Sequence, residues 1–182
     1  KLVLIPHSSN LPKDKGFAPI QNQIIRNENK IYNCLIKASA DYMVDSGPIY
    51  LKEYFNLTGN ELWDEIINKS ATEDAKLISI FLNKFPNVHS KKQIGKSTFN
   101  KKRNPEDSQI NINKSIKSQF NILRVCSNKN YPAYFKYKKN SERKITRLIE
   151  ELNTFSESLS DIFPLTIGNY FHFNLQIAIG MI

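Results

Sequence analysis

The stretch that decides the fold class lies at the end of the chain, where residues 170–181 read YFHFNLQIAIGM. From Phe171 to Met181, every second residue is large and apolar, and the residues between them are mostly polar or small. This alternation is typical of a β-strand with one buried face. Gly168-Asn169, directly before it, predicts a turn. The sequence therefore predicts a long final strand in a sheet with one covered face.

The segments before this strand predict a helix and two further strands. Ser141 is a favourable N-cap. Six apolar residues follow it with a helical period, namely Ile145, Leu148, Ile149, Leu152, Phe155 and Leu159. Residues 120–126 and 131–138 predict two strands, joined by a turn at residues 128–130. The second half of the chain thus has the order strand, strand, helix, strand.

The first half of the chain is predicted to be mainly helical. Apolar residues at helical spacing predict a helix over residues 20–36, and Gly47-Pro48 interrupts that pattern. A second helix is predicted over residues 60–67. The capping-box sequence of residues 70–73 then opens a third helix, which Pro86 ends.

Together these patterns predict an α+β fold with helices packed on one face of a mostly antiparallel sheet. Residues 1–18 contain several Pro and Gly residues and predict an extended N-terminal arm. Residues 89–113 are polar and basic and predict a long exposed loop. Because 182 residues suit one domain rather than two, residues 19–182 are predicted to form a single domain.

The positive charge of the chain is concentrated in one part of the sequence. The whole chain has a net charge of +9, and residues 89–147 contain sixteen Lys or Arg and three acidic residues. Concentrated positive charge indicates an anionic partner, of which a phosphate-bearing polymer is the commonest and an anionic lipid surface the second choice. The residues expected to contact RNA phosphates are Lys91, Lys92, Lys96, Lys101, Lys102, Arg103, Lys114, Lys117, Arg124, Lys136, Lys138 and Arg143.

Several motifs keep other functions open. The triplets Glu28–Lys30, Asp74–Lys76 and Glu142–Lys144 have the acid-x-Lys form of some nucleases. They support the alternative of a DNA-binding or metal-dependent nuclease-like protein of a phage, plasmid or restriction system. A helix-turn-helix within residues 90–99 and an effector that binds anionic membranes through the basic loop are further alternatives. Residues 95–98 read GKST, but Ser90 stands where a phosphate-binding loop needs its first Gly.

Other classes have little support in the sequence. His7, His89 and His172 lie far apart, and no His/Cys pair has zinc spacing, so we expect no metal site and no cofactor. Cys34 and Cys126 are predicted core residues of a reduced protein. No apolar run is long enough to span a membrane, and we expect no membrane partner.

The second half of the chain also resembles a known family, that of large-subunit ribosomal protein five, which binds 5S ribosomal RNA. Lys114-Ser115-Ile116, followed by Phe120, Ile122 and Arg124, is similar to its "KSIAxFKIR" strand. Residues 161–163 and 168–170 are similar to its "RDF" and "GNYSxG" turns. The sequence departs from the family at residues 136–139, where the Gly of "TLRG" is lost.

This resemblance implies a structural constituent of the large ribosomal subunit, with no catalytic residues and no enzymatic activity. Its implied partners are ribosomal RNA and neighbouring ribosomal proteins, with no small-molecule substrate. A divergent mitochondrial member of the family is expected, or a cytoplasmic one if the source is bacterial.

Overall fold

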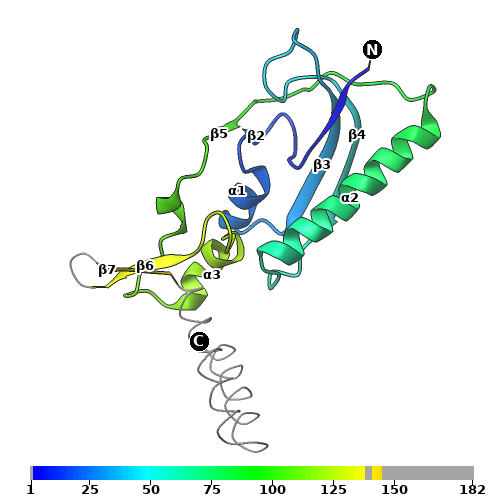
Figure 1. Ribbon diagram of the computed structural model, residues 1–182. Helices are drawn as coiled ribbons and strands as arrows, with labels where there is room; N and C mark the ends of the chain where they lie inside the picture. Colours follow the sequence, from blue (N-terminus) through cyan, green and yellow to red (C-terminus); the bar gives the residue numbers. More distant parts are fainter. Residues whose placement is uncertain (1, 138–140, 145–182) are drawn as a thin grey trace, which may run out of the picture. The chain divides into compact units, whose positions relative to one another are not determined.

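The computed structural model describes residues 2–137 and 141–144 (Figure 1). The chain divides between Arg103 and Asn104 into two compact units. The first unit contains β1 (Leu4–His7), β2 (Lys15–Gly16), α1 (Pro19–Ile25), β3 (Lys30–Lys37), β4 (Ile49–Asn56), α2 (Trp63–Lys84) and β5 (Phe99–Asn100). The second contains the short 3-10 helix η1 (Pro105–Ser108), α3 (Ile116–Arg124), β6 (Tyr134–Tyr137) and β7 (Ser141–Lys144).

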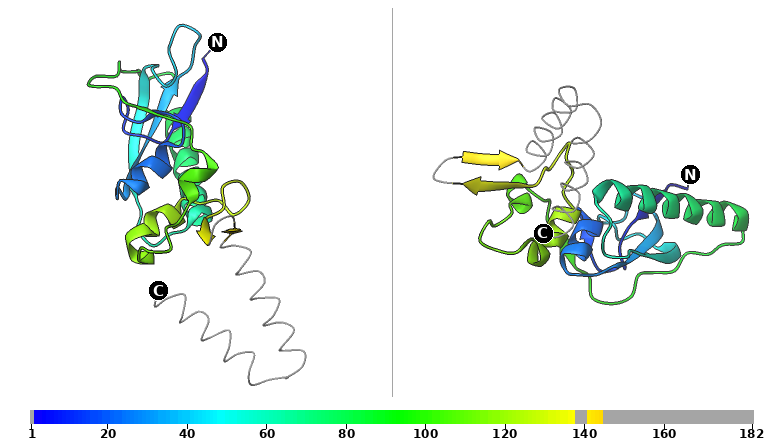
Figure 2. Two further views of the ribbon diagram at one scale, coloured as in Figure 1. Left: turned by 90° about the vertical axis from the view of Figure 1, so that its left-hand side faces the viewer. Right: turned by 90° about the horizontal axis from the view of Figure 1, so that it is seen from below.

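The centre of the first unit is an antiparallel sheet with the strand order β1-β3-β4. Because successive side chains of a strand point to opposite faces, β3 contributes to two apolar clusters. Leu35 packs with Leu77 and Phe81 of α2, on the face along which α2 runs (Figures 1 and 2). Cys34 and Ile36 pack with Leu11 in a second cluster. The sheet is therefore covered on both faces at β3.

Helix α2 is continuous from Trp63 to Lys84. Its first turn contains Asp64 and Glu65, whose negative charge suits a helix N-terminus. Its last residue, Lys84, is followed by Phe85 and Pro86. The helix ends here because Pro has no backbone N–H to continue the helical hydrogen bonds. The predicted end at Pro86 is therefore confirmed. The predicted separation into two helices near residue 70 is wrong, because the capping-box residues 70–73 lie inside α2.

The predicted helix over residues 20–36 is confirmed only at its start. Helix α1 ends at Ile25, and Asn27 has a positive φ of 66° that no α-helix continues through. Residues 30–37 form strand β3 instead, and its partner β4 was not predicted at all. Residues 1–18, predicted as an extended arm, contain β1 and β2, and Leu11 in this segment is 2% exposed.

The second unit also departs from the predicted pattern. Residues 120–126 were predicted as a strand, but Ile116–Arg124 forms α3, which Ser115 caps through its side chain. The turn at residues 128–130 is confirmed, and β6 lies within the strand predicted over residues 131–138. Ser141 begins strand β7 rather than a helix.

The predicted helix after Ser141 falls beyond β7, and it lies outside the described residues, as does the strand at residues 170–181. The coarse prediction of an α+β fold with a mostly antiparallel sheet is confirmed, although β2 and β5 form a parallel pair. The arrangement of all helices on one face and the single domain over residues 19–182 stay predictions.

Candidate functional site

The candidate site lies where β1 ends, at a buried histidine beside a carboxylate. His7 is the last residue of β1 and is 8% exposed. Its Nδ1 lies 3.5 Å from Oδ1 of Asp45, and its Nε2 lies 3.1 Å from the backbone carbonyl oxygen of Asp14. A carbonyl oxygen can only accept, so Nε2 carries the proton of the neutral ring. Nδ1 is then free to accept a proton next to the Asp45 carboxylate.

Asp45 is held in place by its own backbone and by neighbouring loops. Its φ of 53° is in the left-handed region, and the N–H of Gly16 donates to its Oδ2 at 2.8 Å. The side-chain amide of Gln93 donates to the carbonyl oxygens of Asp45 and Gly47, both at 2.8 Å. A Cβ on Gly47 would lie 1.8 Å from the carbonyl oxygen of Lys37, so the close approach here requires glycine.

Lys15 is a buried cation beside the same loop. It is 5% exposed, and its Nζ donates to Oγ of Ser46 at 2.8 Å and lies 5.6 Å from the ring centroid of Phe99. Buried lysines are rare unless they are paired. Within the part of the chain that the structure describes, no carboxylate forms an ion pair with Lys15. Two buried basic groups therefore contact neighbouring residues of one loop: the imidazole of His7 lies beside Asp45, and the ammonium group of Lys15 is bonded to Ser46.

The loop that orients His7 is itself anchored by an ion pair. Asp14 has a φ of 58°, and its carboxylate lies 2.8 Å from Nη2 of Arg26. The hydrogen bond to Glu28, together with that to Asp14, raises the pKa of Arg26. The neighbouring Cys34 donates its Sγ–H to the carbonyl oxygen of Ser9 at 3.2 Å, and burial raises the pKa of its thiol. A thiol with a raised pKa is a poor nucleophile, which agrees with the predicted core role of Cys34.

The basic segment 91–103 is tied to this site by backbone and side-chain contacts. Strand β5 pairs with β2 in parallel, with Lys15 opposite Phe99. The N–H of Asp14 donates to Oγ1 of Thr98 at 2.8 Å. Gln93 of the same segment holds the Asp45 loop, as described above. The segment thus contacts both loops that hold His7, although it is more than 80 residues away from His7 in sequence.

Most of the residues predicted to contact RNA have accessible side chains. The exposed ones are Lys91, Lys92, Lys96, Lys101, Lys102, Lys114, Lys117 and Lys136. Arg103 is half-buried, Arg143 lies in β7, and Lys138 lies outside the described residues.

Arg124 departs from this prediction. It is 1% exposed, and its Nη1 donates to Oδ1 of Asn121 at 3.1 Å, because α3 turns this side chain inward. It therefore presents no guanidinium to an external phosphate.

The sequence did not identify His7 and Asp45 as a pair. The available signal was the apolar run of residues 2–5 followed by a polar His, which indicates a buried strand with a functional side chain at its end.

The alternative motifs of the sequence form no such site in the described residues. Residues 95–98 are exposed and no helix follows them, so they form no phosphate-binding loop. No group of His, Cys, Asp and Glu residues suited to a metal ion occurs in the described ranges.

Comparison with solved structures shows which class of fold this is: the structure resembles a formyltransferase domain. The methionyl-tRNA formyltransferase from Clostridium thermocellum aligns with a TM-score of 0.63 and 26% identity, over 75% of this chain and 58% of that one. A 4-N formyltransferase from Francisella tularensis aligns with a TM-score of 0.65 and 17% identity, over 79% and 61%. HypX from Aquifex aeolicus in complex with tetrahydrofolic acid aligns with a TM-score of 0.64 and 18% identity, over 74% and 24%.

Among curated proteins, the chain is similar to methionyl-tRNA formyltransferases of Rickettsia. The protein of Rickettsia massiliae is 30% identical over 177 residues, which are 96% of this chain and 54% of the relative. That of Rickettsia typhi is 32% identical over the same coverage. The chain therefore spans about half the length of the curated relatives it matches. No protein-family model matches the chain.

These similarities correct the functional predictions made from sequence. The chain is similar to formyltransferases, which are enzymes, so the ribosomal assignment, the mitochondrial ribosome and the expectation of a non-enzymatic protein are wrong. The DNA-binding or nuclease-like alternative is wrong for the same reason. The physical cause of the error is that residues 114–124, which carried the ribosomal resemblance as a strand, form α3 and its N-cap.

The predicted partners need the same correction. The curated relatives are formyltransferases, and one structural neighbour was solved with tetrahydrofolic acid. These findings do not agree with ribosomal RNA and ribosomal proteins as partners. They also do not agree with the prediction of no small-molecule substrate. As for membranes, the described helices include none with the length and hydropathy of a membrane span.

Proposed function

We propose that this chain supplies the catalytic histidine and the acceptor-binding surface for transfer of a formyl group to the amine of an aminoacyl-tRNA. One observation carries the proposal: the buried His7 lies beside the Asp45 carboxylate, and Gln93 of the basic segment 91–103 holds the loop of Asp45. The similarity to methionyl-tRNA formyltransferases over 96% of the chain supports the same reaction.

Formyl transfer between two nitrogen atoms requires one proton to be moved. The acceptor amine attacks the formyl carbon and forms a new C–N bond, and its nitrogen loses a proton. The C–N bond to the donor then breaks, and the donor nitrogen gains a proton. A single group that accepts and returns one proton is therefore sufficient, and a positioned histidine is the commonest such group.

His7 has the geometry of such a proton carrier. The carbonyl oxygen of Asp14 fixes the proton of the neutral ring on Nε2, so Nδ1 receives the proton from the amine. The Asp45 carboxylate then stabilises the imidazolium cation. The separation of 3.5 Å between Nδ1 and Oδ1 is longer than an ordinary hydrogen bond, so Nδ1 is not held by Asp45 before substrate binds.

The basic segment favours a nucleic-acid acceptor over a small amino sugar. Five exposed lysines lie between residues 91 and 102, and their charge attracts phosphates without reading sequence. A tRNA bound along them has its acceptor end within reach of the His7 loop, because Gln93 and Thr98 join the two. The sugar N-formyltransferases among the structural neighbours, such as that of Shewanella, are 16% identical and support the fold alone.

For the formyl donor we propose a formylated tetrahydrofolate, by analogy of fold with the HypX structure that contains tetrahydrofolic acid. This step rests on fold analogy. The formyl group of the donor would have to reach the acceptor amine beside His7. Loop 38–48, which contains Asp45 and the 76% exposed Met43, lies at this point.

The proposal is tested by assaying formylation of methionyl-tRNA with a formylated tetrahydrofolate as donor. The full chain is assayed alone and mixed with the part of the Rickettsia massiliae protein that lies outside the match. We expect activity in at least one of these arms, and a loss of about 100-fold or more for His7→Gln. His89→Gln is the matched control, because His89 is exposed in the segment after α2. A wild-type chain without activity in either arm contradicts the proposal.

A further inference from the structure

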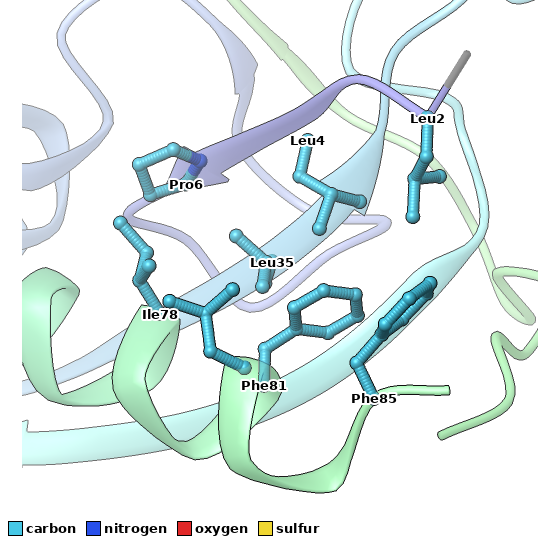
Figure 3. A pocket seen from close by; sticks show the side chains of 8 residues that line it. Leu2, Leu4, Pro6, Leu35, Ile78, Phe81 and Phe85 are labelled. Carbon is cyan, nitrogen blue, oxygen red and sulfur yellow. The ribbon is translucent and has the colours of Figure 1, made fainter. Parts of the chain in front are cut away.

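A small pocket with a polar lining lies between β4 and α2, on the α2 face of the sheet. Beside β1, on the same face, apolar side chains such as Leu35 and Phe81 point into one groove (Figure 3). The pocket beside β4, called here the β4 pocket, has a volume of about 190 Å³ and a different character. Neither His7 nor Asp45 lines the β4 pocket, so it does not belong to the candidate site.

The most buried polar residue of the β4 pocket is Asn33, and one of its side-chain atoms has no partner. Asn33 is 2% exposed, and its Nδ2 donates to Oδ1 of Asp74 on α2 at 2.8 Å. Its own Oδ1 is buried and accepts no hydrogen bond from the described residues. Buried polar atoms nearly always have a partner, because an unmet hydrogen bond costs free energy. Since an amide oxygen can only accept, the missing partner is a donor.

Carboxylates lie beside this amide oxygen. Glu53 is the Cα partner of Asn33 in the β3–β4 ladder, so their side chains are neighbours on the α2 face. Asp74 accepts from Asn33, and burial raises the pKa of this carboxyl group. The ion pairs of the described residues include neither Glu53 nor Asp74. The donor that suits this pocket therefore has a positive charge.

The cation already present does not supply this donor. Nζ of Lys76 lies 2.7 Å from Oε1 of Glu73, and the Lys76 side chain is 61% exposed. This ammonium group therefore sits on the solvent side of Glu73, and it makes no hydrogen bond to Asn33. Its pairing with Glu73 shows that the carboxylates of this pocket accept an alkylammonium group.

The remaining lining favours an aliphatic chain of limited size. Phe55, Leu77 and Ile80 give the β4 pocket an apolar wall, against which methylene groups can pack. The volume is below the roughly 300 to 1,000 Å³ that is usual for drug-sized ligands. The pocket is thus too small for a nucleotide but large enough for a short chain with a charged end.

We propose that the β4 pocket binds the ammonium end of an aliphatic amine. The ammonium group donates to Oδ1 of Asn33 and pairs with Glu53, and the chain packs against Phe55 and Leu77. A free diamine and a lysine side chain of another protein share this chemistry. The proposal does not depend on formyl transfer, because the residues that carry it lie outside the candidate site.

The test measures binding to the full chain by isothermal titration calorimetry at low salt. One probe, 1,4-diaminobutane, represents the free amine, and the other, Nα-acetyl-lysine methylamide, represents a lysine side chain. The control ligand 1,4-butanediol has the same chain as the first probe without its charge. Glu53→Gln and Asn33→Leu remove the two proposed contacts. Glu106→Gln is the matched control variant, because Glu106 is an exposed glutamate of η1.

We expect at least one amine to bind with a stoichiometry of one. Binding should weaken about tenfold in Glu53→Gln and in Asn33→Leu and should not change in Glu106→Gln. Because the chain has a net charge of +9, its overall charge repels an amine, and binding reports a local site. Tighter binding of diaminobutane assigns the site to a free amine, and tighter binding of the blocked lysine assigns it to a protein side chain.

Three results overturn the proposal. The first is no binding of either amine, which would mean that water alone satisfies Asn33. The second is equal binding of butanediol, and the third is an equal effect of Glu53→Gln and Glu106→Gln. Glu53 is exposed, so its variant keeps the test decisive even where Asn33→Leu fails to fold. No formylation is measured, so failure here leaves the proposed function standing, and the reverse also holds.

Discussion

Lys15 and Gln93 both hold the loop that carries Asp45, and neither touches the imidazole of His7 in the contacts described. Lys15 acts through the hydroxyl of Ser46, and Gln93 acts through two backbone carbonyl oxygens. Hydrogen bonds that involve a charged donor are stronger than neutral ones, so Lys15 contributes more than a neutral residue would. Under the proposed function these two side chains keep the carboxylate beside the ring while substrate enters.

Glu61 gives a pH-dependent prediction at the same scale. Burial alone would raise the pKa of Glu61, but its carboxylate accepts the N–H groups of Thr58 and Gly59 at 2.7 and 3.0 Å, and these bonds lower the pKa to about 2. The stabilisation is therefore present above the unfolded pKa of 4.5 and is lost as the pH falls towards 2.

We expect Glu61→Gln to lower the free energy of unfolding at pH 7 by about 1 kcal/mol or less, since the carboxylate is largely solvated. The difference between wild type and variant should shrink by more than half between pH 7 and pH 3. Urea unfolding followed by circular dichroism measures it. A difference that stays constant over this range would show that the pKa of Glu61 is the same in the folded and unfolded states.

At the scale of elements, α2 and the antiparallel sheet stabilise each other through a small number of buried side chains. Leu77 is 1% exposed and packs with Leu35 and Phe81, and the ring of Tyr50 from β4 meets Phe81 edge to face at 5.4 Å. The exposed side of α2 carries Lys76 and Glu73 in an ion pair of 2.7 Å, which contributes little. The packing of α2 therefore decides the stability of the first unit.

We expect Leu77→Ala to lower the free energy of unfolding by about 3 kcal/mol, because it removes buried methyl groups and leaves a cavity against Leu35. Leu82→Ala, on the same helix but 65% exposed, should change it by less than about 0.5 kcal/mol. Equilibrium denaturation of both variants provides the comparison. Equal losses would mean that α2 is not packed on the sheet in solution.

The same elements show how far the sequence alone could lead. Helix α2 and its end at Pro86 follow from periodicity, because one face of the helix is apolar and the other polar. Strand β3 does not, because Cys34, Leu35 and Ile36 are all buried and the strand has no alternation. Ile31, Leu35 and Ile36 fit a helical spacing equally well. In α3, the Ser115 cap overrides the aromatic and β-branched residues of the segment.

The site shows the same division between local and distant information. The exposure of the basic lysines was predictable, because charge alone keeps them in water. The pairing of His7 with Asp45 was not, because it depends on where β1 ends against β3 and on Gly47 fitting under Lys37. Those contacts depend on the strand register, which could not be predicted from the sequence of this chain alone.

At the scale of the whole molecule, the proposed function assigns the attraction of tRNA to the exposed lysines of the basic segment. Each lysine that neutralises a phosphate releases a counterion, so binding to RNA should weaken steeply with salt. Lys101 and Lys102 are exposed residues of the segment, whereas Lys76 and Lys84 are exposed residues of α2 and lie outside it. These two pairs have equal charge and therefore provide a matched comparison.

We expect Lys101→Ala with Lys102→Ala to reduce the slope of log binding constant against log salt concentration for tRNA by about 1.5 to 2. Lys76→Ala with Lys84→Ala should leave the slope within about 0.5 of wild type. Filter binding over a range of salt concentrations gives both slopes. The same loss for both pairs would show that net charge, and not the basic segment, attracts the nucleic acid.

The parallel pairing of β2 with β5 has a consequence for the order in which the protein folds. Asp14 and Thr98 directly precede these two strands and are joined by a hydrogen bond, yet they are separated by 84 positions along the chain. Contacts of such separation form late, because the intervening chain must be ordered first. During synthesis from the N-terminus, the β1-β3-β4 sheet and α2 emerge before residues 93–98 do. The surroundings of His7 are therefore the last part of the first unit to be completed, and a nascent chain that ends at α2 has a core but no finished site.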